Sequence, residues 1–276
     1  MERISKLTQQ ERAQRSVDKL NEMPGELNDG YDCPKCKNRG FVFYVAESKA
    51  ANGETIYRES TYPCQCMKTR SSIRRMKRSG LESIVRKCTF ERYEASEEWQ
   101  KNIKEAAQRF ANEVSSIEHK WFFIGGGVGS GKTHLCTAIA RKLLYDGYEV
   151  RYMLWLDESK RLKACVNDES RYMELIEPLK NADVLYIDDF LKTAKDTYGN
   201  EPNPTTADMT LAYEIINHRY LNPNLVTIIS SERYIGEISD IDEAVGSRIY
   251  EMTKNNAYNI ARDKDRNYRT KDMKML

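Results

Sequence analysis

The sequence predicts an α/β protein with a mainly parallel, helix-covered sheet, preceded by a small cysteine-containing hairpin and a helical linker. After Lys120, short apolar runs alternate with helical patterns, which is typical of a parallel sheet. A cluster of glycines follows the first of these runs, and four of the seven cysteines gather within residues 33–66. The 276 residues, 40% of them hydrophobic, suffice for one sizeable core and one small additional domain.

The N-terminal part is expected to contain a polar helix, a hairpin and two further helices. Residues 3–21 carry sparse apolar side chains at helical spacing, and "MPG" then breaks the pattern. The alternating stretches "FVFYV" and "TIYRESTY" are separated by Asn52-Gly53, a turn signal that predicts a β-hairpin. A basic helix begins at Met67, and another helix extends through Phe110.

In the α/β part, strands are predicted over 121–125, 149–155, 184–188 and 225–230, and helices over 132–145 and 207–220, with a further helix near 157–180 that has irregularities. The stretch 193–206 is too long and polar for a simple connection. The predicted division is an N-terminal helical arm over 1–30, a cysteine hairpin domain over 31–67, a basic helical linker over 68–115 and an α/β domain over 116–276.

The glycine cluster matches the P-loop pattern, Gly126-x4-Gly131-Lys132-Thr133, with an apolar strand before it and a helix after it. Glycines allow the backbone to turn sharply and to present successive N–H groups to phosphate oxygens. Lys132 is expected to reach the β and γ phosphates of ATP, and the Thr133 hydroxyl to bind Mg²⁺. The predicted nucleotide-binding residues are Gly126, Gly127, Val128, Gly129, Ser130, Gly131, Lys132, Thr133 and His134.

Acidic and hydroxyl side chains follow two later strands. Asp188 and Asp189 end the apolar run "VLYI", and carboxylates at the C-terminal end of such a strand face the ligand crevice of an open α/β sheet. We expect Asp188 to hold Mg²⁺ and Asp189 to orient or polarise the attacking water. Ser230 or Ser231, after the strand "LVTII", is predicted to sense the γ-phosphate or to position the water, and Ser231 is the preferred candidate.

The pairs Cys33-x2-Cys36 and Cys64-x-Cys66 supply four thiolates, enough for a tetrahedral Zn²⁺ site of the structural type. The intervening hairpin would return the chain to its starting point and bring the two pairs together. Four reduced, unliganded cysteines are the alternative. The isolated Cys88, Cys136 and Cys165 are interpreted as core or incidental thiols.

Two runs of basic residues stand out although the formal net charge is only +2. The first run consists of Lys68, Arg70, Arg74, Arg75, Lys77 and Arg78. It is suited to bind a phosphate backbone or an acidic helicase surface, and a solvated linker face is the alternative. The second is predicted to touch nucleotide or DNA, and consists of Arg262, Lys264, Arg266, Arg269 and Lys271. The sequence has no apolar run that could span a bilayer and no signal-peptide core at its start, so a cytoplasmic location without membrane contact is expected.

The combination of the P-loop, Asp188-Asp189, "AYEIINHRY", "TIISS" and "GSRIYEM" resembles the AAA+ ATPases of the DnaC and DnaI helicase-loader family, which includes phage versions and IstB-like relatives. The segments "CPKC", "CQC" and "CTFERY" are also similar to phage-type loaders, so the resemblance covers nearly the whole chain. It implies a five-stranded AAA+ core, ATP, Mg²⁺ and Zn²⁺ as cofactors, and a bacterial host with a phage or prophage origin.

The resemblance also implies a function: ATP-dependent loading of a replicative hexameric helicase onto single-stranded DNA, by protomers assembled into a ring or spiral. Arg248 would then be the arginine finger that completes a neighbour's ATP site. Two residues differ from the family pattern, since Glu232 replaces an Asn and Asp189 replaces a longer Glu. An IstB-like ATPase that regulates a transposase, and a weakly hydrolysing, ATP-dependent DNA-binding switch, are the alternatives.

Overall fold

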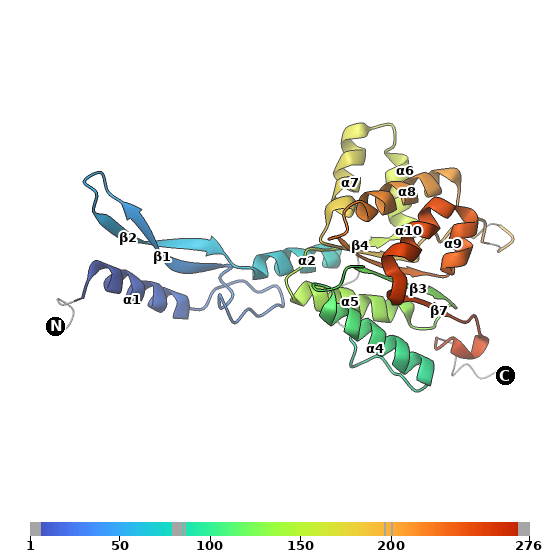
Figure 1. The fold of residues 1–276 in the computed structure, drawn as a ribbon, viewed down its shortest axis with the longest axis horizontal. Coiled ribbons are helices and arrows are strands. Elements are labelled where there is room, and N and C mark those ends of the chain that lie inside the picture. The colour runs from blue at the N-terminus through green and yellow to red at the C-terminus, as the bar shows by residue number, and fades with distance from the viewer. Residues whose placement is uncertain (1–6, 79–84, 86, 196, 200, 270–276) are drawn as a thin grey trace. The chain divides into compact units, whose positions relative to one another are not determined.

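The computed structural model describes residues 7–78, 85, 87–195, 197–199 and 201–269. The chain divides into two compact units, residues 1–71 and 72–276 (Figure 1). Each unit has its own arrangement of helices and strands and is described separately below.

The first unit combines one helix with one hairpin. Helix α1 (Gln9–Glu22) begins at Thr8, whose hydroxyl and the Glu11 carboxylate form a capping box. Strands β1 (Phe41–Lys49) and β2 (Thr55–Pro63) pair antiparallel, which confirms the predicted hairpin. Helix α2 (Cys66–Arg78) starts in this unit, and residues 79–84, which the predicted basic helix also included, lie outside the described residues.

Helix α1 is attached to the hairpin through one side-chain amide. The Asn21 amide donates to the carbonyl of Phe43 at 2.9 Å and accepts from the N–H of Phe43 at 3.0 Å. The apolar core of this unit is small. Among the described residues before Ser72, the buried hydrophobic side chains are Val17 and the four clustered cysteines.

The second unit contains the predicted five-stranded sheet. Its strands are β3 (Trp121–Gly126), β4 (Val150–Leu154), β5 (Val184–Asp188), β6 (Val226–Ser231) and β7 (Ala257–Ile260). Their spatial order is β4-β5-β6-β3-β7, and every neighbouring pair is parallel. The carboxyl ends of β3, β5 and β6 therefore meet at one edge, as the fold class requires.

Helices cover both faces of this sheet (Figure 1). They are α4 (Glu98–Glu113), α5 (Lys132–Tyr145), α6 (Trp155–Ala164), α7 (Glu169–Asn181), α8 (Thr206–Tyr220), α9 (Ile235–Ile241) and α10 (Glu243–Thr253), with short 3-10 turns at Lys254–Asn256 and Lys264–Arg266. Strand residues alternate between the two cores: Phe122 and Ile124 pack with α4 and α5, whereas Trp121 and Phe123 pack with helices α6 to α10.

The helix predicted near 157–180 was expected to be irregular, and the irregularity is a complete break. Two helices, α6 and α7, occupy this segment, and the chain breaks between them because the Asp168 carboxylate caps α7 by accepting from the N–H of Arg171 at 3.1 Å. In the long connection 193–205, the described residues form neither helix nor strand.

A buried arginine joins α7, α8 and β6. Arg219 is fully buried, and its guanidinium donates to Thr227 Oγ1 at 2.9 Å and to the carbonyl of Val226 at 2.7 Å. It also donates to the carbonyls of Leu179, Lys180 and Ala182 at 3.0–3.1 Å. These bonds satisfy carbonyls at the C-terminal end of α7 that the helix itself leaves unpaired.

Candidate functional site

The P-loop lies between β3 and α5, as the motif predicts. At two of its glycines, the backbone angle is positive and a neighbouring group leaves no room for a Cβ atom. Gly131 has φ 90°, and a Cβ there would lie 2.8 Å from the ring of Tyr93. Gly126 has φ 114°, and a Cβ there would collide with the carbonyl oxygen of Ile260 in β7. The loop therefore keeps its backbone amides accessible at the start of α5.

Lys132 is almost fully buried and is held inside the loop. Its ammonium donates to the carbonyls of Gly126 at 2.9 Å and Gly127 at 2.6 Å. Burial lowers the pKa of Lys132. Because the partners are neutral carbonyls, a phosphate group would be a stronger acceptor for this ammonium.

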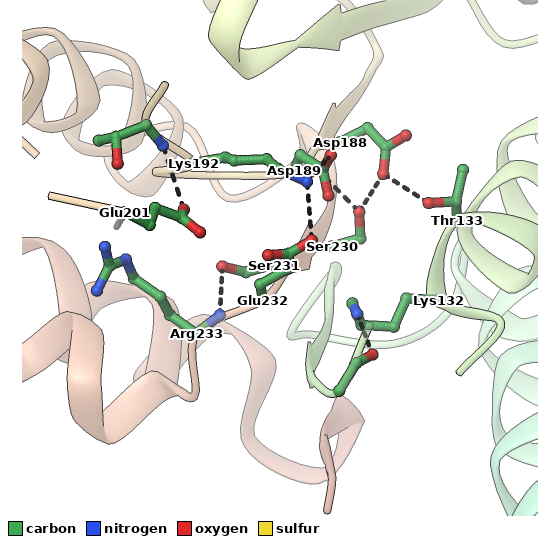
Figure 2. Close-up of polar contacts among 12 residues, drawn as sticks. Lys132, Thr133, Asp188, Asp189, Lys192, Glu201, Ser230, Ser231, Glu232 and Arg233 are labelled. Carbon is green, nitrogen blue, oxygen red and sulfur yellow. Dashed lines mark hydrogen bonds and ion pairs between the residues drawn. The ribbon is translucent and has the colours of Figure 1, made fainter. Parts of the chain in front are cut away.

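Asp188 is the centre of a hydrogen-bond cluster that includes Thr133 and Ser230 (Figure 2). The Thr133 hydroxyl donates to Asp188 Oδ1 at 3.1 Å, and Ser230 donates to the same oxygen. The hydroxyl of Tyr152, on β4, donates to Asp188 Oδ2 at 3.2 Å. The Thr133 hydroxyl and the Asp188 carboxylate are 55 residues apart in the chain, yet they lie side by side. These two oxygen groups are suitable ligands for Mg²⁺.

Asp189 has a left-handed backbone, with φ 53°, and its side chain forms an ion pair. The Lys192 ammonium lies 3.0 Å from Asp189 Oδ2 and 2.8 Å from Glu232 Oε1. Burial raises the pKa of Asp189, and the Lys192 ammonium opposes that shift. Lys192 is a residue of this site that the sequence pattern did not reveal, because residues 189–192 form a turn and have no helical periodicity.

The two serines at the end of β6 bond to the segment that follows β5. Ser231 donates to the carbonyl of Phe190 at 2.8 Å and accepts from the N–H of Arg233 at 3.1 Å. Ser230 contacts Asp188, and it accepts from the N–H of Asp189 at 3.3 Å. Both serines are buried, so their hydroxyls position the acidic pair within this arrangement.

A cavity of about 390 Å³ opens over the P-loop. We call it the P-loop cavity; it is lined by Cys88, Val128, Gly129, Ser130, Gly131, Lys132, Thr133, His134, Asp189, Lys192, Glu232, Tyr268 and Arg269. His134 is fixed at the rim, where its Nε2 lies 2.8 Å from the carbonyl of Thr89. The volume of the P-loop cavity falls within the range of small-molecule sites, about 300–1,000 Å³.

The C-terminal segment returns to this cavity. The Tyr268 N–H donates to the carbonyl of Gly129 at 3.1 Å, and Arg269 lines the cavity wall. Other residues of the second basic run are used to attach this segment: Arg262 pairs with Glu237, and the guanidinium of Arg266 lies over a Trp99 ring. The Lys264 side chain and Lys271 lie outside the described residues.

Arg248 lies on α10 and does not line the P-loop cavity of its own chain. Its guanidinium lies between the rings of Tyr213 and Tyr220, 5.2 and 5.3 Å from their centroids. Hydrogen bonds to Asn217 Oδ1 at 3.1 Å and to the carbonyl of Ala244 at 2.8 Å hold it there. The side chain is thus positioned at the surface of α8 and α10.

The four clustered cysteines come together in the first unit. All four Sγ atoms lie within 4.8 Å of one another, with Cys33 to Cys64 at 3.8 Å and Cys36 to Cys66 at 3.4 Å. A tetrahedral Zn²⁺ with bonds of about 2.3 Å would place its sulfurs about 3.8 Å apart, so the donor set fits zinc.

Arg70 belongs to this cysteine module, which corrects its assignment to an exposed basic surface. Its side chain is 1% exposed, forms an ion pair with Asp29 and donates to Asn38 Oδ1 at 2.5 Å. Lys68 and Arg74 are exposed, whereas the side chains of residues 75–78 are outside the description. The helix therefore presents fewer cations than its sequence suggests.

Within the described part of the chain, none of the helices combines the length and the apolar character needed to cross a bilayer.

Comparison with known proteins identifies relatives of the second unit and of most of the chain. Residues 84–253 match the bacterial DnaA ATPase domain family. The phage-like element PBSX protein XkdC of Bacillus subtilis is 30% identical over 240 residues, which cover 84% of each chain. The replicative helicase loader DnaC of Buchnera aphidicola subsp. Schizaphis graminum is 26% identical, with 80% of this chain and 78% of DnaC covered.

Among solved structures, AMPPCP-bound DnaA from Aquifex aeolicus shares the fold with a TM-score of 0.50 at 23% identity. The match covers 67% of this chain and 53% of that DnaA chain, so it spans about half of the DnaA structure.

Proposed function

Because this chain belongs to the AAA+ ATPases that include the bacterial DnaA ATPase domain and DnaC-type loaders, we propose that it loads a replicative helicase onto single-stranded DNA. The observation that carries the proposal is the convergence of Lys132, Thr133 and Asp188 at one sheet edge. The relatives supply the biological context, since the DnaC proteins bear the name of replicative helicase loaders.

Nucleotide binding follows from the loop and its lysine. The amides of the P-loop would hold the phosphates of ATP, and the Lys132 ammonium would exchange the carbonyls of Gly126 and Gly127 for the β and γ phosphates. Thr133 and Asp188 would hold Mg²⁺, directly or through water; the ion would neutralise charge on the β and γ phosphates.

Hydrolysis would use Asp189. In this step the oxygen of a water molecule bonds to the γ-phosphorus, and the bond to the β,γ-bridging oxygen breaks, so that ADP leaves with that electron pair. The water proton passes to the Asp189 carboxylate and from there to phosphate or solvent. Asp189 must be ionised to accept it, so the rate falls as pH falls through the raised pKa of Asp189.

Assembly would complete the site. Arg248, whose guanidinium contacts the rings of Tyr213 and Tyr220, would reach the γ-phosphate bound by an adjacent protomer of a ring or spiral. Ser231 would act indirectly, because its bonds to Phe190 and Arg233 hold the segment that carries Asp189.

The first unit would hold one structural Zn²⁺ through Cys33, Cys36, Cys64 and Cys66, since four protein thiolates leave no open coordination position. A bound zinc with four thiolates carries a net negative charge, and the buried guanidinium of Arg70 would offset part of it. This arrangement gives Arg70 a role inside the module.

The test measures ATP hydrolysis with and without single-stranded DNA, and capture of a DnaB-type helicase with and without ATP. Lys132→Ala should abolish hydrolysis, and Asp188→Asn should reduce it by about a hundredfold or more. Lys142→Ala is the matched control, because Lys142 lies on the same helix and, among the described residues, its ammonium pairs with Asp146 at the surface. Failure to capture the helicase under both conditions would refute the loader function, while hydrolysis insensitive to Lys132→Ala would refute the site.

A further inference from the structure

Lys192 is a second lysine in the P-loop cavity, and its partners differ from those of Lys132. Its ammonium is shared between two carboxylates, Asp189 at 3.0 Å and Glu232 at 2.8 Å. All three side chains line the cavity that also contains Lys132 and Thr133 (Figure 2). The Lys192 side chain is 32% exposed, so its ammonium is accessible to a ligand in the cavity.

The hydroxyls expected to sense the γ-phosphate are occupied elsewhere. Ser230 donates to Asp188, and Ser231 donates to the carbonyl of Phe190. Neither serine is among the described residues that line the cavity. Among the described residues that line the P-loop cavity, the lysines and arginines are Lys132, Lys192 and Arg269, and Lys192 is the one paired with Asp189.

We propose that Lys192 senses the γ-phosphate, exchanging its bonds to Asp189 and Glu232 for the terminal phosphate of ATP. The proposal rests on the proposed ATPase function and assigns a further residue to the same site. ADP lacks the γ-phosphate, so it leaves Lys192 on the two carboxylates. Glu232 stands where the family pattern has Asn, and in this proposal its carboxylate is the second group that binds the Lys192 ammonium when ATP is absent.

The exchange links the arrival of ATP to the state of Asp189. While Lys192 lies 3.0 Å away, its ammonium occupies Asp189 Oδ2. When the ammonium moves to the phosphate, this oxygen is released and can accept a hydrogen bond from the attacking water. The same movement places a positive charge on the γ-phosphate, where negative charge must be stabilised.

The first test compares binding of a non-hydrolysable ATP analogue and of ADP, both with Mg²⁺, by calorimetry on the full chain. Lys192→Gln should weaken the analogue about tenfold, the value of one charge-assisted contact, and change ADP affinity less than about twofold. Lys192→Arg should restore most of the analogue affinity. Lys132→Ala, in contrast, should weaken both nucleotides.

A second variant has the opposite expected effect. Glu232→Gln removes one competitor for the ammonium, so the analogue should bind about threefold more tightly, and this gain should vanish in the Lys192→Gln background.

Equal effects of Lys192→Gln on both nucleotides, or no effect on either, would overturn the γ-phosphate role while leaving the ATPase assignment intact. A wild-type chain that binds neither nucleotide would overturn both. Thermal unfolding of each variant separates lost binding from lost structure, because a merely structural role lowers Tm without changing the preference for the analogue over ADP.

Discussion

Removal of zinc is expected to unfold the first unit and to leave the ATPase unit intact. Apart from the four cysteines, Val17 is the buried hydrophobic side chain among the described residues of this unit. Its burial contributes about 1.5–3 kcal/mol, whereas zinc binding to such thiolates contributes about 10–16 kcal/mol. With zinc bound, the hairpin would therefore depend on the metal several times more than on its apolar core.

The perturbations are a strong chelator and the substitution Cys64→Ser, applied to the full chain. Metal analysis should find one zinc per wild-type chain and a substoichiometric amount in Cys64→Ser. Limited proteolysis should then cut within 41–63 in the zinc-depleted protein, while ATP affinity changes less than about twofold, since the P-loop lies in the other unit. Cys165→Ser is the matched control and should retain zinc.

Two results would refute this reasoning. A zinc-free wild-type chain whose hairpin resists protease would show that the apolar contacts suffice. Stoichiometric zinc in Cys64→Ser would show that Cys64 is not a ligand.

Further predictions concern single side chains. Arg219→Met removes five hydrogen bonds, four of them buried, and should cost about 4 kcal/mol of unfolding free energy in urea titrations. Gly131→Ala forces a Cβ against Tyr93 at φ 90° and should weaken ATP binding about tenfold or more in calorimetry. Arg70→Ala should speed zinc transfer to a chelator about tenfold without changing DNA affinity in anisotropy assays, whereas the exposed Arg74→Ala should leave zinc transfer unchanged.

The order of strands and helices in the second unit could be predicted because its patterns are local. The helix over 132–145 and the strand over 184–188 have the predicted bounds. Strand β7 was missed, since four residues are too few for an alternating pattern and the pairing with β3 defines them as a strand. The break between α6 and α7 was expected only as an irregularity, although Asp168 is an N-cap signal, because amphipathic spacing continues on both sides.

The acidic pair of the site could be predicted for a topological reason. Parallel strands place their carboxyl ends at one edge, so residues after β3, β5 and β6 converge whatever their distance in sequence. The partners of charged side chains could not be predicted in this way. Arg70 was grouped with its basic neighbours, yet the fold buries it against Asp29. Side-chain pairing depends on which elements meet, and the helical pattern around Arg70 contains no information about Asp29.

The same distinction explains why two lysines in one cavity can have different tasks. Lys132 is held by the neutral carbonyls of Gly126 and Gly127, which any phosphate outcompetes, so it should bind ADP and ATP alike. Lys192 is held by two carboxylates, which compete with phosphate on nearly equal terms. Its release therefore requires the charge and the position of the γ-phosphate together. The strength of the existing partners, more than the lysine itself, makes one cation a general phosphate ligand and the other a discriminator of ATP from ADP.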